Sequence, residues 1–338
     1  MVRTGARNLI TDDSGLKVGH AEDVRIRTGV TVLMGDASFA AVTDIRGGSP
    51  GTRDTGTLNL LSMGLPVEAL VLSGGSLYGL DAPSGVISHL GKIGRGVHYE
   101  QGVAPLPLVP GAILFDLANG GDKSWGDEPP YRVLGKKAAE TADVDFALGN
   151  AGAGFGARAG AYKGGVGSAS AVSDDGITVG ALVVVNSVGS PIIPATDSFW
   201  AFALEQQNEF GGRKLTDFGR IDLDLPGDMK DARSIAANTT LAIVATDVDL
   251  SRSALQQLAI MATDGFARAL RPVHTPFDGD LVFAVSTNAK TFSATEPYET
   301  MRLGSLAADC LARAIARGVY EAKSLGALKS YREVFGLG

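Results

Sequence analysis

The 338-residue sequence is poor in side chains that form disulfides or bind metals. Cys310 is its one cysteine, which excludes an intramolecular disulfide and is typical of a reducing compartment. The residues around Cys310 have a helical amphipathic pattern, so we expect a buried structural thiol. The four histidines are scattered, none is paired with another at helical spacing, and no cysteine accompanies them. We therefore expect no zinc site, and no cofactor is predicted.

Long apolar runs and clusters of positive charge are also missing. No run of 18 apolar residues occurs, so we expect no membrane-spanning helix. The first seven residues lack the apolar stretch of a secretion signal, which together with the single cysteine favours a cytoplasmic protein. The net charge is −7, and no run of five lysines or arginines is present. Nucleic acid is therefore not expected as the main partner, because its binding depends largely on neutralising phosphates.

Glycine, by contrast, is abundant, at 45 of 338 residues against a usual ~7 %. The glycines lie in apolar surroundings, which indicates tight turns and close backbone approach rather than disorder. The stretch Gly152 to Ala157 formally matches a dinucleotide-binding fingerprint, but a functional fingerprint opens a helix. Further glycines follow at positions 160, 164, 165 and 167, which disfavours a helix. A nucleotide-binding module is therefore only a weak, non-enzymatic alternative.

Apolar runs typical of strands alternate with helical patterns along the chain. The predicted strands are Gly29 to Met34, Phe39 to Asp44, Ala69 to Leu72, Ile113 to Phe115, Ile177 to Val185, Leu241 to Thr246 and Leu281 to Val285. Several are continuously apolar, as expected of strands covered on both faces. Helical periodicity runs from Ser253 to Leu270, from Leu303 to Leu325 and, less regularly, from Leu77 to Leu90. These patterns predict a layered α/β protein with stacked sheets between helices.

Two polar segments interrupt this pattern without dividing it. Lys123 to Arg132 contains two adjacent prolines and is predicted to be a surface loop. Gln206 to Ala236 is polar and rich in aspartate, so we expect a flexible segment. No linker splits the core, and no internal repeat is found. Residues 1–338 are therefore expected to form a single α/β domain.

The tripeptide Asn238-Thr239-Thr240 stands directly before the apolar run Leu241 to Thr246. Asn is depleted from strands and Thr is enriched, so the Asn238–Thr239 peptide bond is predicted to lie where a loop enters a buried strand. Attack of the Thr239 hydroxyl on the Asn238 carbonyl would break the chain there. Thr239 would then carry a nucleophilic oxygen and an α-amine with a pKa of about 8 that can act as its base. From these three residues alone, an ordinary loop–strand junction is the simpler explanation.

Other polar residues could support such chemistry, and each has a structural alternative. Asp278 and Asp280, separated by one glycine, could hold an ammonium or orient a hydroxyl, or could form an ordinary Asp-Gly turn. Asn186 ends a predicted strand, where its amide could donate to an oxyanion or cap a turn. Lys163 stands among glycines and could donate to the same site or be a solvated loop lysine. His274 is expected to form hydrogen bonds within a turn.

Taken as an ordered set, these segments resemble the DmpA-type aminopeptidase family of self-cleaving N-terminal nucleophile hydrolases, whose fold is shared with ornithine acetyltransferases. The matching segments run almost from end to end: Val18 to His20, Asp44 to Asp54, Leu72 to Asp81, Lys163 to Ser168, Val184 to Asn186, Asn238 to Thr240 and His274 to Asp280. The Asn-Thr junction and the Asp-Gly-Asp loop resemble the branch that contains nylon-oligomer hydrolases. Peptidase members hold the substrate ammonium with an acidic residue in a Gly-Glu-Thr stretch, where this chain has Ala112 to Asp116.

The resemblance implies a four-layer αββα sandwich that is cut between Asn238 and Thr239 into residues 1–238 and 239–338. It implies hydrolysis of linear amides in small peptides, amino-acid amides or 6-aminohexanoate oligomers, and a homo-oligomer of the cleaved chains. An acyltransferase of the ornithine acetyltransferase type is the alternative, since the shared fold permits an amine to take the acyl group in place of water.

The resemblance also implies roles for five residues. Thr239 would be the nucleophile, and Asn186 and Lys163 would lie near the reacting carbonyl. Asp278 and Asp280 would support the amine and the hydroxyl of Thr239. These assignments follow from the family's motifs and not from the spacing of the residues.

Overall fold

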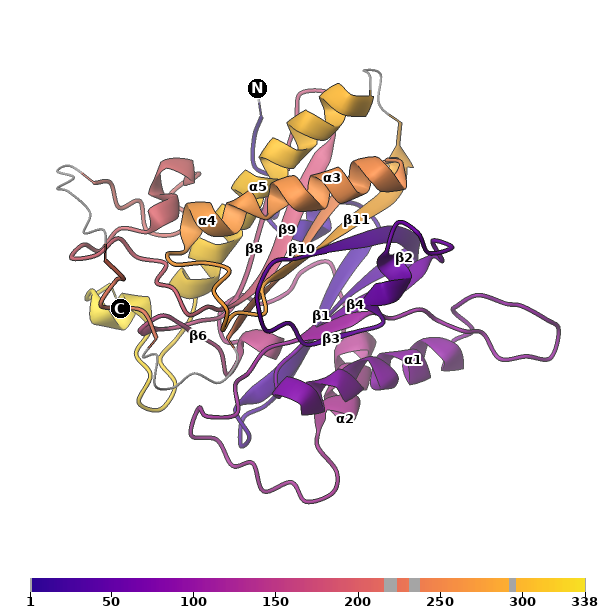
Figure 1. Ribbon diagram of the computed structural model, residues 1–338, viewed down its shortest axis with the longest axis horizontal. Helices are drawn as coiled ribbons and strands as arrows, with labels where there is room; N and C mark the ends of the chain where they lie inside the picture. Colours follow the sequence, from indigo (N-terminus) through magenta and orange to yellow (C-terminus); the bar gives the residue numbers. More distant parts are fainter. Residues whose placement is uncertain (1, 216–223, 231–237, 292–295, 338) are drawn as a thin grey trace.

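The computed structural model describes residues 2–215, 224–230, 238–291 and 296–337, and Figure 1 shows how their elements are arranged. Nine strands of this part of the chain form one sheet in the order β3-β5-β4-β2-β11-β10-β9-β8, with β1 paired to β2. Their bounds are β1 (Leu16–Asp23), β2 (Thr28–Ile45), β3 (Thr52–Arg53), β4 (Val67–Ser73), β5 (Gly111–Ile113), β8 (Val166–Val172), β9 (Thr178–Asn186), β10 (Thr239–Val248) and β11 (Leu281–Lys290). A small ribbon pairs β6 (Arg158–Ala159) with β7 (Tyr162–Lys163).

The helices gather on opposite sides of the strands, with α3, α4 and α5 on one side and α1 and α2 on the other (Figure 1). Their bounds are α1 (Ala82–Lys92), α2 (Tyr131–Glu140), α3 (Arg252–Ala262), α4 (Asp264–Ala269), α5 (Glu296–Tyr320) and α6 (Tyr331–Val334). Short 3₁₀ helices are η1 (Ile10–Asp12), η2 (Thr55–Leu58), η3 (Ser76–Asp81), η4 (Gly152–Gly154) and η5 (Trp200–Leu204).

The long strand β2 belongs to both halves of the sheet. Its first part, Thr28 to Gly35, pairs with β1, and Val30 to Met34 and Phe39 pair with β4. Ala40 to Ile45 pair with β11. The register against β4 shifts between Met34 and Phe39, and such irregularities bend a strand. The chain therefore passes from one half-sheet to the other without a loop, which allows the two halves to lie face to face.

Three buried apolar clusters define the layers. One joins Leu33 and Leu70 of one half-sheet to Leu182, Leu241 and Phe283 of the other. A second packs the opposite face of β8 to β11 against α3, α4 and α5. A third packs β2 and β4 against α1 and α2. The order helix, sheet, sheet, helix is the predicted αββα sandwich, and apolar burial on both faces of each half-sheet stabilises it.

Most strand predictions are confirmed with changed boundaries, but β1, β8 and the two-residue strands β3, β6 and β7 are not among them. Gly29 to Met34 and Phe39 to Asp44 are parts of β2, because the stretch between them stays extended. The strand predicted from Ile113 to Phe115 is wrong in position, since β5 covers Gly111–Ile113 and shares only Ile113 with it. Strands β1 and β8 are not predicted from the sequence, because glycine, serine, alanine and charged residues hide their apolar alternation.

One predicted helix is divided in two, and helix α2 is not predicted. Ser253 to Leu270 is divided into α3 and α4 at Thr263, whose hydroxyl donates to the Ala259 carbonyl, and such back-bonding bends helices. Helix α2 is not predicted, because Gly135 interrupts its pattern. This glycine lies where α1 and α2 touch: a Cβ there would lie 2.2 Å from the Ala82 carbonyl oxygen.

Other segments agree more closely. The predicted loop that starts at Lys123 ends at Pro130, where α2 begins. The helix predicted from Leu77 to Leu90 is η3 followed by α1, and the one predicted from Leu303 to Leu325 is α5, which ends at Tyr320. Within the predicted flexible segment Gln206 to Ala236, residues 216–223 and 231–236 lie outside the described residues. Cys310 is a buried free thiol of α5, as expected.

Glycines bring helix α5 into direct contact with the sheet. A Cβ on Gly167 of β8 would lie 1.9 Å from the Ala314 carbonyl oxygen, which confirms the predicted close approach. The Gly152–Gly154 stretch makes a single 3₁₀ turn and is followed by strand β6, so the helix of a dinucleotide fingerprint is not formed. In the part of the chain that the structure describes, no helix is long and apolar enough to cross a membrane.

Candidate active site

The Asn238–Thr239 peptide bond lies at the point where β10 begins, as predicted. Thr239 is opposite Asn186 in the antiparallel pairing of β10 with β9, and Asn238 forms an isolated parallel bridge with Asp278. All four residues are at least 95 % buried. Residues that are far apart in the sequence therefore meet at one end of the sheet because of strand order and register.

The hydroxyl of Thr239 lies against the carbonyl group that it would attack. Thr239 Oγ1 donates to the Asn238 carbonyl oxygen at 2.5 Å, and the Gly279 N–H donates to the same oxygen at 2.6 Å. A Cβ on Gly279 would lie 2.7 Å from Thr239 Oγ1, so a larger residue would displace the hydroxyl. A backbone N–H at this position stabilises the negative charge that develops on a carbonyl oxygen during attack.

Asp278 holds the loop on one side of Gly279. Its Oδ1 accepts from the Val188 N–H at 3.1 Å, and its Oδ2 accepts from the N–H and the hydroxyl of Thr275 at 3.0 and 2.5 Å. Burial and the neighbouring Asp280 raise the pKa of Asp278. The Asp278 side chain therefore positions the loop, and its hydrogen bonds go to Val188 and Thr275 rather than to Thr239.

Asp280 connects the same loop to Thr240, the residue after Thr239. Its Oδ1 accepts from the Thr240 N–H at 2.7 Å. Its Oδ2 accepts from the His274 N–H at 3.1 Å and lies 3.0 Å from His274 Nδ1. His274 is in a loop with φ of 54° and forms hydrogen bonds there, as expected, but its partner is a carboxylate of the candidate site. The two carboxylates thus flank Gly279, and Asp280 also holds the backbone of Thr240.

Asn186 and Lys230 form a buried polar network beside the Asn238–Thr239 peptide bond. Lys230 Nζ donates to Asn186 O at 3.0 Å, to Asn186 Oδ1 at 3.1 Å and to Asn238 Oδ1 at 2.7 Å. Asn186 Oδ1 also accepts the Arg158 N–H, and Asn186 Nδ2 donates to the Phe115 carbonyl at 3.1 Å. Burial and then Arg158 lower the pKa of Lys230 well below its usual value. Asn186 lines the cavity described below, but its Nδ2 donates to Phe115 and not to the Asn238 carbonyl.

Lys163 is fully buried in β7, where it pairs with Arg158 of β6. Its Nζ donates to the carbonyls of Gly154 and Gly164 at 2.9 and 2.7 Å. Burial lowers the pKa of Lys163 to about 7, and Asp116 opposes the shift. Lys163 is therefore not a solvated loop lysine. Its amine donates to the carbonyls of Gly154 and Gly164 rather than to the Asn238 carbonyl.

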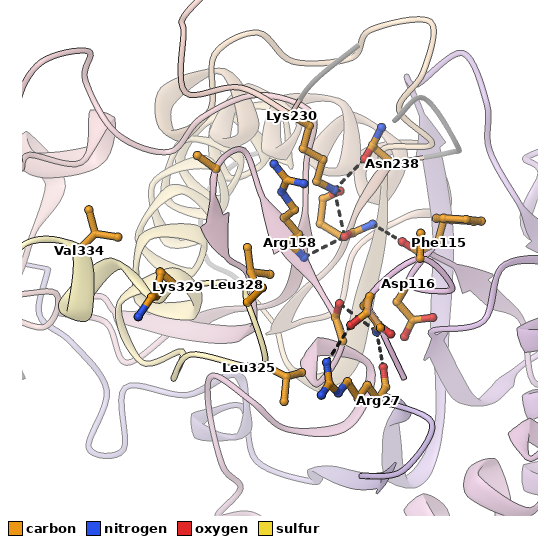
Figure 2. Close-up of a pocket in the computed structure, with 17 residues that line it drawn as sticks. Arg27, Phe115, Asp116, Arg158, Lys230, Asn238, Leu325, Leu328, Lys329 and Val334 are labelled. Atoms are coloured by element: carbon orange, nitrogen blue, oxygen red, sulfur yellow. Dashed lines mark hydrogen bonds between the residues drawn. The ribbon is translucent and has the colours of Figure 1, made fainter. Parts of the chain in front are cut away.

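A cavity of about 660 Å³ opens beside Asn186 and Asn238 (Figure 2). Its described lining has the following residues: Arg27, Phe115, Asp116, Ala118, Asn119, Gly120, Gly156, Arg158, Ala161, Asn186, Lys230, Asn238, Leu325, Ala327, Leu328, Lys329 and Val334. Asp116 accepts from Thr28 Oγ1 at 2.6 Å and from the Gly75 N–H at 2.8 Å. Burial raises the pKa of Asp116 to about 6. Among the described residues, no group of three or more acidic, histidine or cysteine side chains is placed to hold a metal ion.

Sequence reasoning missed two contributors to this site. Lys230 belongs to a polar segment and has no motif around it, so the sequence offers no sign that its amine is buried between two asparagines. The Gly279 N–H is a backbone group, and only the bridge between Asn238 and Asp278 aims it at the carbonyl. The Asp-Gly-Asp pattern was a usable signal for the loop but not for this donor.

Comparison with known proteins agrees with this geometry. The model of peptidase family S58 matches residues 8–332. An uncharacterised aminopeptidase of Mycobacterium bovis is 41 % identical over 345 residues, covering 97 % of this chain and 98 % of the relative. A 6-aminohexanoate-oligomer endohydrolase of Kocuria sp. strain KY2 is 30 % identical over 293 residues, covering 84 % of this chain and 76 % of the relative.

Solved structures share the fold. A β-aminopeptidase of a Burkholderia species superposes with a TM-score of 0.70 at 19 % identity and covers 98 % of this chain and 91 % of its own. The L-aminopeptidase D-Ala-esterase/amidase of Ochrobactrum anthropi, described as a variant of the Ntn hydrolase fold, has a TM-score of 0.69 at 19 % identity and covers 99 % and 96 %. This chain therefore has that sandwich fold, belongs to peptidase family S58 and is an amide-hydrolysing enzyme.

Proposed function

We propose that the chain cleaves itself between Asn238 and Thr239 and then acts as an N-terminal threonine amide hydrolase. The observation that carries this proposal is the geometry at one carbonyl. Thr239 Oγ1 and the Gly279 N–H both reach the Asn238 carbonyl oxygen, at 2.5 and 2.6 Å. A nucleophile and an oxyanion donor are the two groups that acyl transfer requires, and here both act on the same bond.

Self-cleavage would proceed through an ester. Thr239 Oγ bonds to the Asn238 carbonyl carbon, the C–N bond breaks, and the hydroxyl proton passes to the departing nitrogen. Water then hydrolyses the ester, which leaves a carboxylate on Asn238 and a free amine and hydroxyl on Thr239. In turnover, that amine takes the hydroxyl proton while the oxygen attacks the substrate. An acyl-enzyme forms, the amine product leaves, and water releases the acid.

The remaining site residues would support these steps from fixed positions. Asp278 and Asp280 hold the loop around Gly279 and the Thr240 N–H, so they are placed to orient the new amine of Thr239. Asn186 is directly opposite Thr239, and a rotation of its amide would bring Nδ2 toward a substrate carbonyl. Lys163, with a pKa of about 7, would assist from its buried position in β7.

The substrates that we propose are linear amides. Relatives of this chain include aminopeptidases and 6-aminohexanoate-oligomer endohydrolases, so small peptides, amino-acid amides and 6-aminohexanoate oligomers are the compounds to assay. We also propose, from the family resemblance, that the cleaved chains assemble into a homo-oligomer in the cytoplasm.

Two variants of the nucleophile test the proposal. Thr239→Ala removes the oxygen used in both reactions, so it should remain one intact chain and hydrolyse none of these amides. Thr239→Ser keeps a hydroxyl and should retain part of both activities. Intact mass, N-terminal sequencing for Thr-Thr-Leu-Ala, and turnover of the amide panel with and without an added amine acceptor are the measurements. Full activity in a wild-type chain that stays intact would contradict self-cleavage, and product formed only with the amine present would indicate an acyltransferase.

A further inference from the structure

The cavity beside the scissile bond carries more positive than negative charge, although the whole chain has a net charge of −7. Its described lining contains two lysines and two arginines but a single carboxylate, Asp116. Lys329 is ion-paired with Glu333, and Lys230 is occupied by the two asparagines. Arg27 and Arg158 therefore provide the permanent charge, because a guanidinium stays protonated. A cleft with low-dielectric walls concentrates such a field on whatever enters it.

Arg27 occupies a backbone position that is costly for an arginine. It lies in the turn between β1 and β2, with φ of 59°, a left-handed conformation that asparagine and glycine adopt more readily. Its N–H donates to the Asp23 carbonyl at 2.8 Å, and its own carbonyl accepts from Asn119 Nδ2 at 2.5 Å. The surroundings thus hold a strained residue in place, and strain of this kind is concentrated at functional sites.

The guanidinium of Arg27 is seated in the cavity wall. Its Nη1 donates to the Asn119 carbonyl at 3.1 Å. A Cβ on Gly120 or on Gly326 would lie 3.2 or 2.5 Å from the same nitrogen, so glycines on two loops make room for it. Within the described residues, this carbonyl is the one recorded acceptor of the group, which leaves its other N–H groups for a ligand.

Resting on the proposed function, we propose that the cavity selects linear amides that carry a carboxylate, and that Arg27 binds this carboxylate. Figure 2 shows Arg27 at the opposite end of the cavity from Asn238, with Leu325 and Leu328 along one side. A substrate whose amide carbonyl lies at Thr239 would therefore place an aliphatic spacer along these leucines. Its carboxylate would then meet a guanidinium, which matches it in charge and geometry.

Matched substrate pairs test this selection. In the 6-aminohexanoate dimer the carboxylate is on the leaving amine, and the C-terminal amide of the dimer is the partner that lacks it. In glutaryl anilide the carboxylate is on the acyl group, and glutaramoyl anilide, with a terminal amide, is the partner that lacks it. We expect wild type to favour the acid of at least one pair, and the favoured pair identifies the side of the scissile bond that faces Arg27. Arg27→Asn tolerates the left-handed turn but lacks the cation. It should lower kcat/KM for that acid by about 10- to 100-fold and hardly change the value for the neutral partner.

Three controls make the result specific. Arg25→Asn removes a neighbouring arginine that is half exposed and ion-paired with Asp122, so it should change neither substrate. Arg27→Lys keeps the charge without the fork and should restore part of the preference. The melting temperature of Arg27→Asn should not fall, since asparagine is accepted at this φ.

Binding separates this inference from the proposed function. In the Thr239→Ala background, which cannot turn over, calorimetry should show the favoured acid binding at least ~10-fold more tightly than its amide, with the difference lost on adding Arg27→Asn. That result supports the carboxylate site even if wild type proves not to cleave itself. Equal affinity for acid and amide, or a preference that survives Arg27→Asn, overturns it even in a fully active enzyme.

Discussion

Lys230 has no role predicted from the sequence, but its amine joins the two asparagines beside the Asn238–Thr239 bond. Its three donors are directed to Asn186 O, Asn186 Oδ1 and Asn238 Oδ1. Lys230→Met has a similar length but no donor, so it removes the lysine hydrogen bond from each of these oxygens and frees the Asn238 side chain, whereas Asn186 Oδ1 keeps the Arg158 N–H. We expect it to slow self-cleavage by about tenfold or more, as loss of a positioning contact does.

The control for this prediction comes from the same cavity. Lys329→Met removes a lysine that is ion-paired with Glu333 near the surface, and it should mature at the wild-type rate. The measurement is the time course of conversion of the intact chain, followed by mass spectrometry, with a melting curve for each variant. Maturation of folded Lys230→Met at the wild-type rate would show that the lysine only fills space.

Asp116 should make stability depend on pH in the acid range. Its pKa is raised by burial from 3.8 to about 6, so between these values the native state holds a proton that the unfolded chain releases. The free energy of unfolding should therefore fall as pH rises from about 4 to about 6. Asp116→Asn stays neutral and can keep both hydrogen bonds, since Thr28 Oγ1 can accept as well as donate.

Denaturant titrations at several pH values check this sign. Asp116→Asn should gain on wild type as pH rises, by ~3 kcal/mol at most above pH 7, from ~1.4 kcal/mol per pKa unit. Both proteins should carry Thr239→Ala, so that one covalent chain is compared. A constant difference between them across this range would mean that the carboxyl titrates normally.

At the scale of elements, the glycines of α1 distinguish contact from propensity. A Cβ on Gly85 would lie 1.9 Å from the Arg132 carbonyl oxygen of α2, whereas a Cβ on Gly91 would meet nothing within 4 Å. Gly85→Ala should therefore destabilise by ~1–3 kcal/mol through overpacking. Gly91→Ala, in the same helix, should stabilise by ~0.5–1 kcal/mol because alanine is the better helix former.

Chemical denaturation in the uncleaved background measures both substitutions. Equal effects of the two would mean that α1 and α2 are not in close contact. Close contact of the same kind occurs between Gly167 of β8 and helix α5, where a side chain would not fit.

At the scale of the whole molecule, cleavage should not separate the fragments. The proposed second fragment has 338 − 238 = 100 residues and begins with β10, which is paired with β9 on one side and β11 on the other. Every residue of β10 is buried, and removing the strand would expose both half-sheet cores to water. The two pieces should therefore run together in size-exclusion chromatography and separate only after denaturation. Elution of an isolated 100-residue fragment from active protein would refute this arrangement.

The sequence by itself determined the fold class, the strand that follows Thr239 and the set of candidate site residues. Apolar runs such as those of β9 to β11 are local signals, because a strand buried on both faces needs apolar residues throughout. The junction at Asn238 is visible for the same reason, since asparagine and threonine differ in their preference for strands. Elements made of small or mixed residues, such as β1 and β8, give no such signal.

Only the tertiary structure decided which groups surround the Asn238 carbonyl. The Gly279 N–H reaches it through the pairing of segments that are 40 residues apart, as Asn238 and Asp278 are. Long-range packing likewise buries Lys230 and places Arg27 between two loops. It also directs the Lys163 amine to backbone carbonyls. A side chain's charge and chemistry follow from its residue type. Its burial and its hydrogen-bond partners depend on segments that are distant in the sequence, and local sequence patterns do not identify those segments.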